Sequence, residues 1–567
     1  MYGAPRLTFD KEVGRNMDLD VLDVNIFDGH SVLLANRISI RGGIITEIGT
    51  GKAADPAERS ITATGKLITP GFVDAHVHTT FGGQESLACD LSAAQGLQAA
   101  LETIRDYLAA TTPGSWVTGG GWSMADFPGG APSAGILDEL SSDRPIILIS
   151  ADHHSAWVNS KAMDIAGLDA STPTPPGGVI EKDETGNPTG CLHESAMDLI
   201  SAQVPDATDA EIRAGLLAGQ SYLESFGITA WMDAIVGDYS GHRSPFDTYV
   251  AAEDTGDLTA EVVGSLWWPR DVKDIDAQVA ALLELRRTQG QFRTTSVKFM
   301  LDGIVESRTA AMSDEYSCPC GGFGTSYFTR EHLHRSFAAL DAAGFDIHCH
   351  AIGDAANRAA LDAFEAIGTS PGRSGGPNDS DSEGGERRHH IAHVQVVDPV
   401  DIPRFAQLGI TANLQALWAC HDQQLLDLNI PYLGEERSGW LYPFRSFADA
   451  GTQLAMGSDW PVSTPNPWEA IHVAVNRSHP DAGDPAPLLP EQAIDLSTAL
   501  CAYTSGSAHL LRSEVNGTIR TGQIANLALA SENAFAIDPR RLAEVHNELT
   551  IAGGHIVHDA TTAERQS

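Results

Sequence analysis

Two histidines one residue apart, His76 and His78, end a short apolar run that begins at Phe72. The run is predicted to be a β-strand, and side chains at positions i and i+2 of a strand point to the same face. Both imidazoles would leave the strand end side by side and could bind one metal ion, since neutral histidine is the commonest metal ligand. The alternative is a polar pair at a strand end, satisfied by hydrogen bonds.

Four further residues of ligand type belong to other predicted strands. Lys298 lies inside an apolar run, His350 and His393 each end one, and Asp459 follows another. Any one of them alone is more often structural, as a buried lysine or a strand-end aspartate. When parallel strands close into a barrel, however, their C-terminal ends meet at one face. The six residues would then converge, which favours a metal centre over six separate structural roles.

Apolar strands that alternate with helical patterns must position these residues, and this alternation predicts βα units and a parallel sheet. Stretches with helical periodicity include residues 330–343, 354–367 and 402–408. Eight strands with intervening helices predict an α/β fold, the TIM (β/α)8 barrel. The predicted strands are residues 71–78, 228–233, 260–267, 296–301, 345–350, 389–394, 410–415 and 453–458.

A long segment separates the first two predicted strands. About 150 residues are too many for one crossover connection, so residues 80–225 are predicted to form an inserted subdomain or lid. The apolar run 146–149 would be a strand of that insertion. Short alternating strands with Gly-rich turns at both ends, residues 1–70 and 515–567, predict one composite β-sandwich. The barrel is expected to span residues 71–514.

Several motifs resemble those of the amidohydrolase superfamily, and specifically its amidohydrolase-3 or YtcJ-like branch. They are Pro70-Gly71-Phe72-Val73-Asp74-Ala75-His76-Val77-His78, Asp302-Gly303 with Ser307-Arg308-Thr309-Ala310, His350-Ala351-Ile352-Gly353-Asp354, Gly457-Ser458-Asp459-Trp460-Pro461 and His154-Ser155-Ala156-Trp157-Val158-Asn159. The resemblance spans nearly the whole chain. It implies a metal-bearing TIM barrel, the composite β-sandwich and hydrolysis of amide-like C–N bonds. The family often has Glu where this chain has Ala392.

The resemblance also implies a set of metal ligands, which in this chain are His76, His78, Lys298, His350, His393 and Asp459. Imidazole and carboxylate ligands suit a divalent ion, Zn²⁺ first, in a site of one or two ions. Lys298 can serve only as a neutral amine or as a carbamate that bridges two ions, because its ammonium would repel a cation. Asp459 is the expected catalytic residue, which takes a proton from the attacking water and passes it to the leaving nitrogen. His348, one step deeper on its strand than His350, is expected to support the ligands.

Four residues are candidates for substrate binding. His154 and Asn159 follow the predicted strand of the insertion, and they could bind substrate or satisfy local backbone groups. Trp122 follows three glycines and could line a lid over an apolar substrate group or anchor a loop in a core. Arg308 could hold a substrate carboxylate or pair with Asp302.

The leading functional hypothesis is a metal-dependent hydrolase that cleaves a non-peptide C–N bond in a linear amide, with N-substituted formamides as the first substrates to test. Hydrolysis of a cyclic amide, or deamination, is a second enzymatic alternative within the superfamily. The third alternative is a metal-binding barrel without catalysis. It predicts a missing ligand or base, whereas all six positions are filled here.

Composition limits the remaining classes of function. The 567 residues carry a formal net charge of −39, which repels nucleic acid and anionic lipid. The resemblance to the amidohydrolases implies a small-molecule amide as the partner. The sequence contains no apolar run of about 18 residues, so no membrane span is predicted, and no secretory signal is visible. The seven dispersed cysteines, with Cys318 and Cys320 interpreted as loop thiols, predict a reducing, cytoplasmic location. A homodimer is left open.

Overall fold

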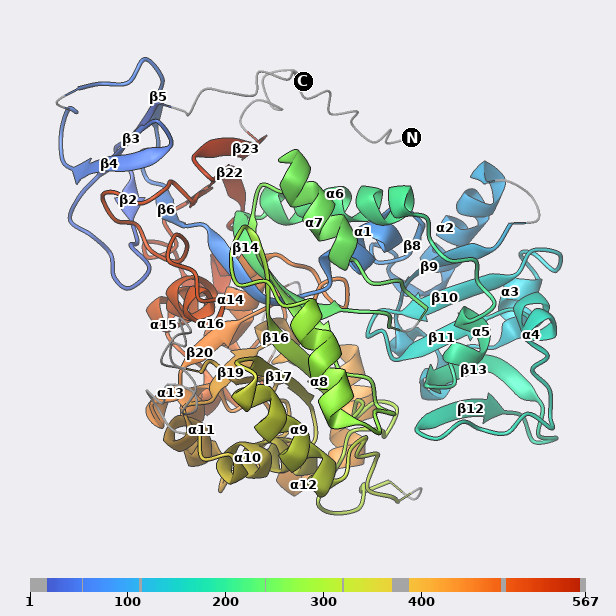
Figure 1. The fold of residues 1–567 in the computed structure, drawn as a ribbon. Helices are drawn as coiled ribbons and strands as arrows, with labels where there is room; N and C mark the ends of the chain where they lie inside the picture. Colours follow the sequence, from blue (N-terminus) through green and yellow to red (C-terminus); the bar gives the residue numbers. More distant parts are fainter. Residues whose placement is uncertain are drawn as a thin grey trace.

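The protein is described from a computed structural model, shown as a ribbon in Figure 1. The description covers residues 18–53, 55–111, 115–239, 241–318, 321–369, 387–480 and 486–560. Residues 1–17 and 561–567, the outer parts of the predicted β-sandwich, therefore lie outside it.

Eight parallel strands form the central sheet, and each predicted barrel strand has its counterpart among them. The prediction of an α/β barrel is therefore confirmed. Almost every side chain of these strands is buried, because helices cover one face and the barrel core fills the other, and this double burial produces continuous apolar runs. In their order in the sheet the strands are β7 (Phe72–Val77), β14 (Ile228–Val236), β15 (Glu261–Trp267), β16 (Phe292–Met300), β17 (Asp346–Ala351), β18 (His390–His393), β19 (Thr411–Leu414) and β20 (Leu454–Met456).

The barrel closes between its first and last strands through hydrogen bonds that join β7 to the residues directly after β20. The backbone N–H of Asp459 donates to the carbonyl oxygen of His76 at 2.7 Å, and the N–H of Ser458 donates to Asp74 Oδ1 at 3.0 Å. Two of the predicted metal ligands therefore form part of this seam.

Helices surround the barrel, and the three predicted from periodicity are present within one residue of their expected bounds. The helix that precedes β14 begins at a capping box, in which Thr208 and Glu211 satisfy each other's backbone N–H groups. The surrounding helices are α1 (Thr79–Ser86), α6 (Asp209–Ser225), α7 (Phe246–Thr255), α8 (Ile275–Glu284), α9 (Arg330–Ala342), α10 (Asp354–Ala366), α11 (Ile402–Leu408), α12 (Ile430–Ser438), α13 (Phe444–Asp449), α14 (Pro467–Asn476), α15 (Leu496–Cys501) and α16 (Ser507–Leu510).

A second sheet lies in the segment between β7 and β14, on the right of the barrel in Figure 1. The apolar run predicted as a strand of the insertion is its β10 (Ile146–Ser150). This sheet has its own apolar core, which includes Leu148 and Trp157. Its other strands are β8 (Cys89–Asp90), β9 (Val117–Trp122), β11 (Ser155–Val158), β12 (Gly178–Lys182) and β13 (Pro188–Glu194), with helices α2 (Gly96–Ala110), α3 (Ala134–Asp138), α4 (Ser160–Ala166) and α5 (Asp198–Ser201).

Strands from both ends of the chain form two further sheets beside the barrel, seen as blue and red ribbons in Figure 1. Residues from the N-terminal and C-terminal segments, such as Ile38 and Ile551, share one apolar core. One sheet contains β1 (Leu19–Leu22), β3 (Arg37–Arg41), β4 (Ile44–Gly49) and β5 (Ser60–Thr62), and the other contains β2 (Asn25–Ile26), β6 (Leu67–Pro70), β21 (Leu527–Ala530), β22 (Asn547–Ala552) and β23 (His555–Asp559).

Two expectations from composition can be compared with the structure. Among the residues described, no helix combines the length and the apolar character needed to cross a membrane. Five of the described cysteines are free thiols, but Cys318 is disulfide-bonded. The interpretation of Cys318 as a loop thiol was therefore wrong.

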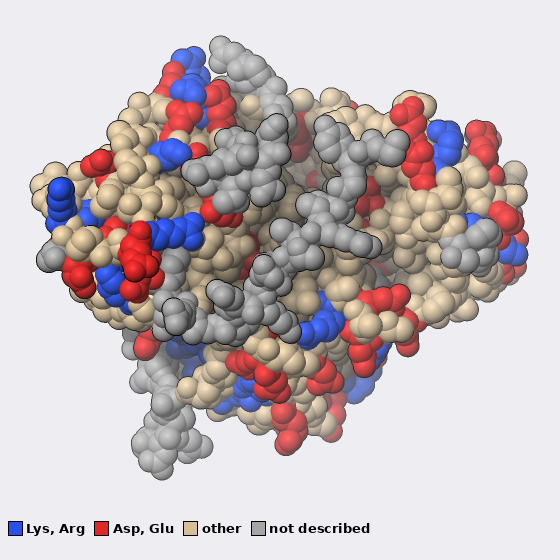
Figure 2. Space-filling view, turned by 90° about the horizontal axis from the view of Figure 1, so that it is seen from above, with Lys and Arg blue, Asp and Glu red and all other residues tan. Residues whose placement is uncertain are grey.

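Charged side chains are distributed over the surface. The chain has 75 acidic and 36 basic side chains. On the face shown in Figure 2, Lys and Arg form small clusters that lie among Asp and Glu side chains. The acidity of this face is thus spread over the surface and is not gathered at one site.

Candidate metal centre

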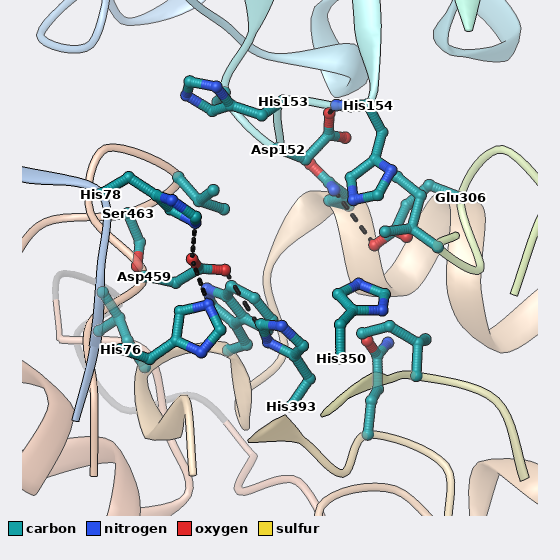
Figure 3. A pocket seen from close by; sticks show the side chains of 18 of the residues that line it. His76, His78, Asp152, His153, His154, Glu306, His350, His393, Asp459 and Ser463 are labelled. Atoms are coloured by element: carbon teal, nitrogen blue, oxygen red, sulfur yellow. Dashed lines mark hydrogen bonds and ion pairs between the residues drawn. The ribbon is translucent and has the colours of Figure 1, made fainter. Parts of the chain in front are cut away.

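A cavity of about 350 Å³ opens at the C-terminal ends of the barrel strands (Figure 3). All six residues proposed as metal ligands line it. The second wall comes from the insertion, whose residues 151–154 face the barrel across the cavity. The barrel thus supplies metal-ligand types, and the insertion supplies the opposite wall.

His76 and His78 occupy the end of β7 and the residue that follows it. His76 is 1% exposed, and its backbone is packed against Gly457. A Cβ atom at position 457 would lie 2.4 Å from the backbone nitrogen of His76, so only glycine allows this close approach. The Gly457-Ser458-Asp459 motif therefore places its carboxylate directly beside the histidine pair.

Asp459 is the residue that joins the histidines. Its Oδ1 lies 3.3 Å from His76 Nε2 and 3.1 Å from His78 Nε2, and its Oδ2 lies 3.8 Å from His393 Nδ1. One ligand atom from each of His76, His393 and Asp459 lies within 4.8 Å of the other two. His350 completes the wall, with its ring 4.5 Å from that of His393.

The electrostatics of this cluster suit a cation. Burial lowers the pKa of the imidazoles of His76, His78, His350 and His393, so that their ring nitrogens are neutral and can act as ligands. Burial alone would raise the pKa of Asp459, but its contacts with His76 and His78 outweigh burial and hold that pKa well below its usual range. Asp459 Oδ1 and His393 Nδ1 are buried without a hydrogen-bond partner. Neutral imidazoles, an ionised carboxylate and buried atoms without partners support a divalent metal ion here.

A further layer of contacts fixes the orientation of the imidazoles, as is usual around metals. His348 Nε2 lies 2.9 Å from His76 Nδ1, which leaves His76 Nε2 facing the cavity. Asp302 Oδ1 lies 3.3 Å from His350 Nδ1. At the position where the family often has Glu, Ala392 is fully buried and offers no polar group.

Lys298 reaches the same cluster from the middle of the barrel. Its Nζ lies 3.3 Å from His76 Nε2 and 3.5 Å from His348 Nε2. Burial lowers the pKa of Lys298 to about 7. A substantial fraction of this side chain is therefore a neutral amine near neutral pH, the form needed for ligation or carbamate formation.

Of the four candidate substrate contacts, only His154 lines the cavity. Trp122 is 2% exposed, donates from Nε1 to the carbonyl oxygen of Leu148 at 2.8 Å and packs against Phe127 and Trp157. It is a core residue of β9, the second of the two roles considered for it, and it is not among the residues that line the cavity.

The other two candidates also have structural roles. Asn159 caps α4, and its Oδ1 accepts the backbone N–H groups of Ile146 and Ala162 at 3.0 Å each. Arg308 is exposed and lies over the ring of Tyr432, 5.7 Å from its centroid. Because the carboxylate of Asp302 faces His350, the expected pairing of Arg308 with Asp302 is absent from the described structure.

Two carboxylates at the site were not foreseen. Glu194 lies 2.7 Å from His154 Nδ1. Glu306 lines the cavity and accepts hydrogen bonds from Asn429 Nδ2 at 2.8 Å and Gln424 Nε2 at 3.1 Å. Neither residue has a recognisable local motif, because its partners are distant in the sequence.

Comparison with known proteins identifies the family of this chain. A sequence model of the amidohydrolase family matches residues 59–558. The chain belongs to the amidohydrolase family. Within it, the chain is 31% identical to the protein LONG AFTER FAR-RED 3 of Arabidopsis thaliana over 94% of this chain and 91% of that protein. It is 27% identical to an N-substituted formamide deformylase of Arthrobacter pascens, over 93% of this chain and 95% of that enzyme.

A solved structure of similar fold is an uncharacterised metal-dependent hydrolase of Pyrococcus horikoshii, with a TM-score of 0.70 and 22% sequence identity. The alignment covers 92% of this chain and 99% of that one. At 22% identity this likeness shows only that the two proteins share a fold. Hydrolase activity of the present chain is supported by its membership of the amidohydrolase family.

Proposed function

We propose that this protein hydrolyses a non-peptide C–N bond in a linear amide. A divalent metal ion would be bound at the site, and Asp459 would move the proton. The observation that carries the proposal is the position of Asp459, whose carboxylate lies within 3.3 Å of two histidine nitrogens at the floor of the cavity. An ionised carboxylate that touches both the metal ligands and the cavity can receive a proton from water there.

The residues that would hold the ion are His76, His78, His350, His393 and Asp459. Their nitrogen and oxygen atoms match the ligand preference of zinc, which we propose as the metal. Bound there, zinc would polarise a substrate carbonyl and lower the pKa of a water molecule to about 7. Each imidazole contributes a lone pair and no proton, because burial keeps it neutral.

Asp459 has the two tasks of a proton shuttle. It accepts a proton from the attacking water and delivers it to the leaving nitrogen, which departs poorly as an unprotonated amide anion. The backbone of Asp459 is fixed by the hydrogen bond that its N–H donates to the carbonyl oxygen of His76, at 2.7 Å. Its carboxylate can therefore serve both steps without moving away from the ligands.

Lys298 decides the number of ions in this proposal. As a neutral amine 3.3 Å from His76 Nε2 it fits a site with one ion. As a carbamate, Lys298 would add two oxygen ligands and a negative charge, which fits a site with two ions. Zinc content per chain, together with a search for the mass of one added CO₂ in the intact protein, separates the two cases.

The walls of the cavity favour an organic amide of modest size. Phe81, Ile235 and Trp418 are among its apolar lining residues, and apolar walls with a few polar groups are typical of small-molecule sites. N-substituted formamides, which would yield formate and an amine, are our first substrate class, because one relative carries that name. Cyclic amides and deamination substrates are the second.

The test compares zinc-loaded protein with N-formyl amines, N-acyl amines and cyclic amides, by release of formate, carboxylic acid or amine. Turnover of linear amides supports the proposal, and turnover of cyclic amides alone favours the second class. Asp459→Ala should abolish turnover while leaving the fold intact, whereas Asp254→Ala, an exposed position on α7, should change nothing. Wild-type activity in Asp459→Ala would contradict the role of Asp459.

A further inference from the structure

A histidine and a glutamate of the insertion form a buried pair at the wall opposite Asp459. His154 Nδ1 lies 2.7 Å from Glu194 Oε1, and the two residues are 9% and 7% exposed. Glu194 ends β13, and His154 immediately precedes β11, which pairs with β13. The insertion therefore holds the pair on adjacent strands.

Residues of the barrel fix the carboxylate of Glu194. Thr309 Oγ1 donates to Glu194 Oε1 at 3.0 Å, and Arg270 Nη2 lies 3.7 Å from Oε2. A Cβ atom at Gly303 would lie 2.4 Å from Glu194 Oε1 and 2.0 Å from Thr309 Oγ1. The Asp302-Gly303 motif therefore leaves room for this carboxylate, and Thr309 of the neighbouring motif binds it.

The ring of His154 faces the candidate metal centre. Its centroid lies 5.8 Å from that of His350, and Figure 3 shows it above His350, across the cavity from Asp459. Because Nδ1 is bound to Glu194, Nε2 lies on the other side of the ring. No residue of the described chain hydrogen bonds to Nε2, although the side chain lines the cavity.

We propose that His154 is a catalytic residue, which donates a hydrogen bond from Nε2 to the carbonyl oxygen of the amide and to the negative charge that develops there. This role rests on the proposed amide hydrolysis. A donor fixed in advance at a developing oxyanion stabilises the transition state more than the substrate, and so raises kcat. Glu194 is a positioning residue, since it acts through His154.

The charges around the pair support a donor at Nε2. Glu194 meets three groups that can carry a proton or a positive charge, His154 Nδ1 at 2.7 Å, Thr309 Oγ1 at 3.0 Å and Arg270 Nη2 at 3.7 Å, and all three favour its ionised form. A carboxylate at 2.7 Å in turn favours the protonated imidazole of His154. An imidazolium carries N–H groups on both nitrogens, so one can serve Glu194 and the other the substrate.

His153 offers a matched control. It is the adjacent residue and also a histidine paired with a glutamate, since its Nε2 lies 3.4 Å from Glu85 Oε2. His153 also lines the cavity, but Figure 3 shows its side chain directed toward the side of His78, away from His154 and His350. Replacing it changes the local charge without removing the proposed hydrogen bond.

The experiment measures binding of methylphosphonate, a tetrahedral anion, to zinc-loaded wild-type, His154→Gln, Glu194→Gln and His153→Gln proteins by calorimetry. We expect the affinity for methylphosphonate to fall roughly 10- to 100-fold in His154→Gln, because one charge-assisted hydrogen bond is lost. The affinity should fall less in Glu194→Gln. In His153→Gln it should fall by under about threefold, because only a screened charge changes. Zinc content and the urea unfolding midpoint, measured for each variant, identify any loss of fold.

Where an amide is turned over, kcat should fall roughly 100- to 1,000-fold in His154→Gln with little change in KM. Equal methylphosphonate affinity in wild-type and His154→Gln, an equal loss in His153→Gln, or no binding to the wild type would overturn the role of His154. If no amide is hydrolysed but the affinity falls as expected, the proposed function fails and the anion-binding role of His154 remains.

Discussion

Asp302→Asn tests whether a buried carboxylate sets the metal affinity through the tautomer of His350. Asp302 is fully buried, and its Oδ2 accepts the backbone N–H groups of Gly353 at 2.8 Å and Ala311 at 2.9 Å. Its Oδ1 accepts the N–H of Ile352 at 3.1 Å and faces His350 Nδ1 at 3.3 Å. Every contact of the carboxylate is therefore with a group that can donate a proton.

An asparagine must place its NH₂ group at one of these two oxygen positions. At Oδ2 it would leave two backbone donors without acceptors, and at Oδ1 only one, so the second orientation is favoured. One unsatisfied buried N–H costs about 1–3 kcal/mol of folding free energy. The NH₂ group would also face His350 Nδ1 and move the ring proton to Nε2, on the metal side. Changes to such supporting groups typically weaken metal binding about 10- to 100-fold, or about 1.4–2.7 kcal/mol.

The assay has two parts, urea unfolding of the metal-free protein and zinc affinity by competition with a chelator. Asp346→Asn is the control, because Asp346 on β17 is also buried, at 5% exposed, but pairs with Arg512 at 2.9 Å, away from the cavity. It should lose stability and keep its zinc affinity. Zinc binding of wild-type strength in Asp302→Asn would refute the reasoning about the tautomer.

Three further changes have outcomes that follow from the structure. Burial raises the pKa of Glu224 to about 7 from an ordinary 4.5, so the folded state holds the proton of this carboxyl more tightly than the unfolded state does. The contribution of this proton to the free energy of unfolding is complete below pH 4.5 and is lost as the pH rises to about 7. The difference is about 3 kcal/mol. Glu224→Gln should remove this decline in pH-dependent urea unfolding, and an unchanged profile would contradict it. Gly457→Ala places a Cβ atom 2.4 Å from the nitrogen of His76 and should cost about 1–3 kcal/mol and most of the zinc affinity, whereas Gly135→Ala, with nothing within 4 Å, should be tolerated. Chelation of the metal should lower the unfolding midpoint, and free zinc at a hundred times Kd should restore about 2.7 kcal/mol; equal midpoints with and without zinc would argue against a site at these residues.

The barrel could be predicted from sequence because strands buried on both faces are continuous apolar runs, as in Val297-Lys298-Phe299-Met300-Leu301. The places of His76, His350 and Asp459 followed, since barrel topology determines where strand ends meet. Their convergence on one cavity is thus a consequence of the fold and needed no knowledge of loops.

Residues whose role depends on packing between distant segments could not be predicted. Glu194 is 40 residues from His154 and more than 100 from Thr309, so no local pattern connects them. The role of Trp122 stayed open between a lid and a core anchor, because its Gly-rich approach resembles a loop. In the structure a Cβ at Gly119 would lie 2.2 Å from the carbonyl oxygen of Cys89, so this glycine serves close strand packing in β9.

The seam between β7 and β20 has a consequence for how the protein assembles. Ser458 and Asp74, which hydrogen bond across it, are 384 residues apart, so the barrel cannot close until synthesis of the chain has passed Asp459. Bringing together the ends of so long a loop costs on the order of 5 kcal/mol of chain entropy. An ion held by His76 on one side and Asp459 on the other would cross-link the seam much as a covalent bridge would. Backbone amides of β7 and β20 should then exchange with deuterium more slowly when the ion is bound, while those of the remote sheet formed by β1, β3, β4 and β5 should not respond.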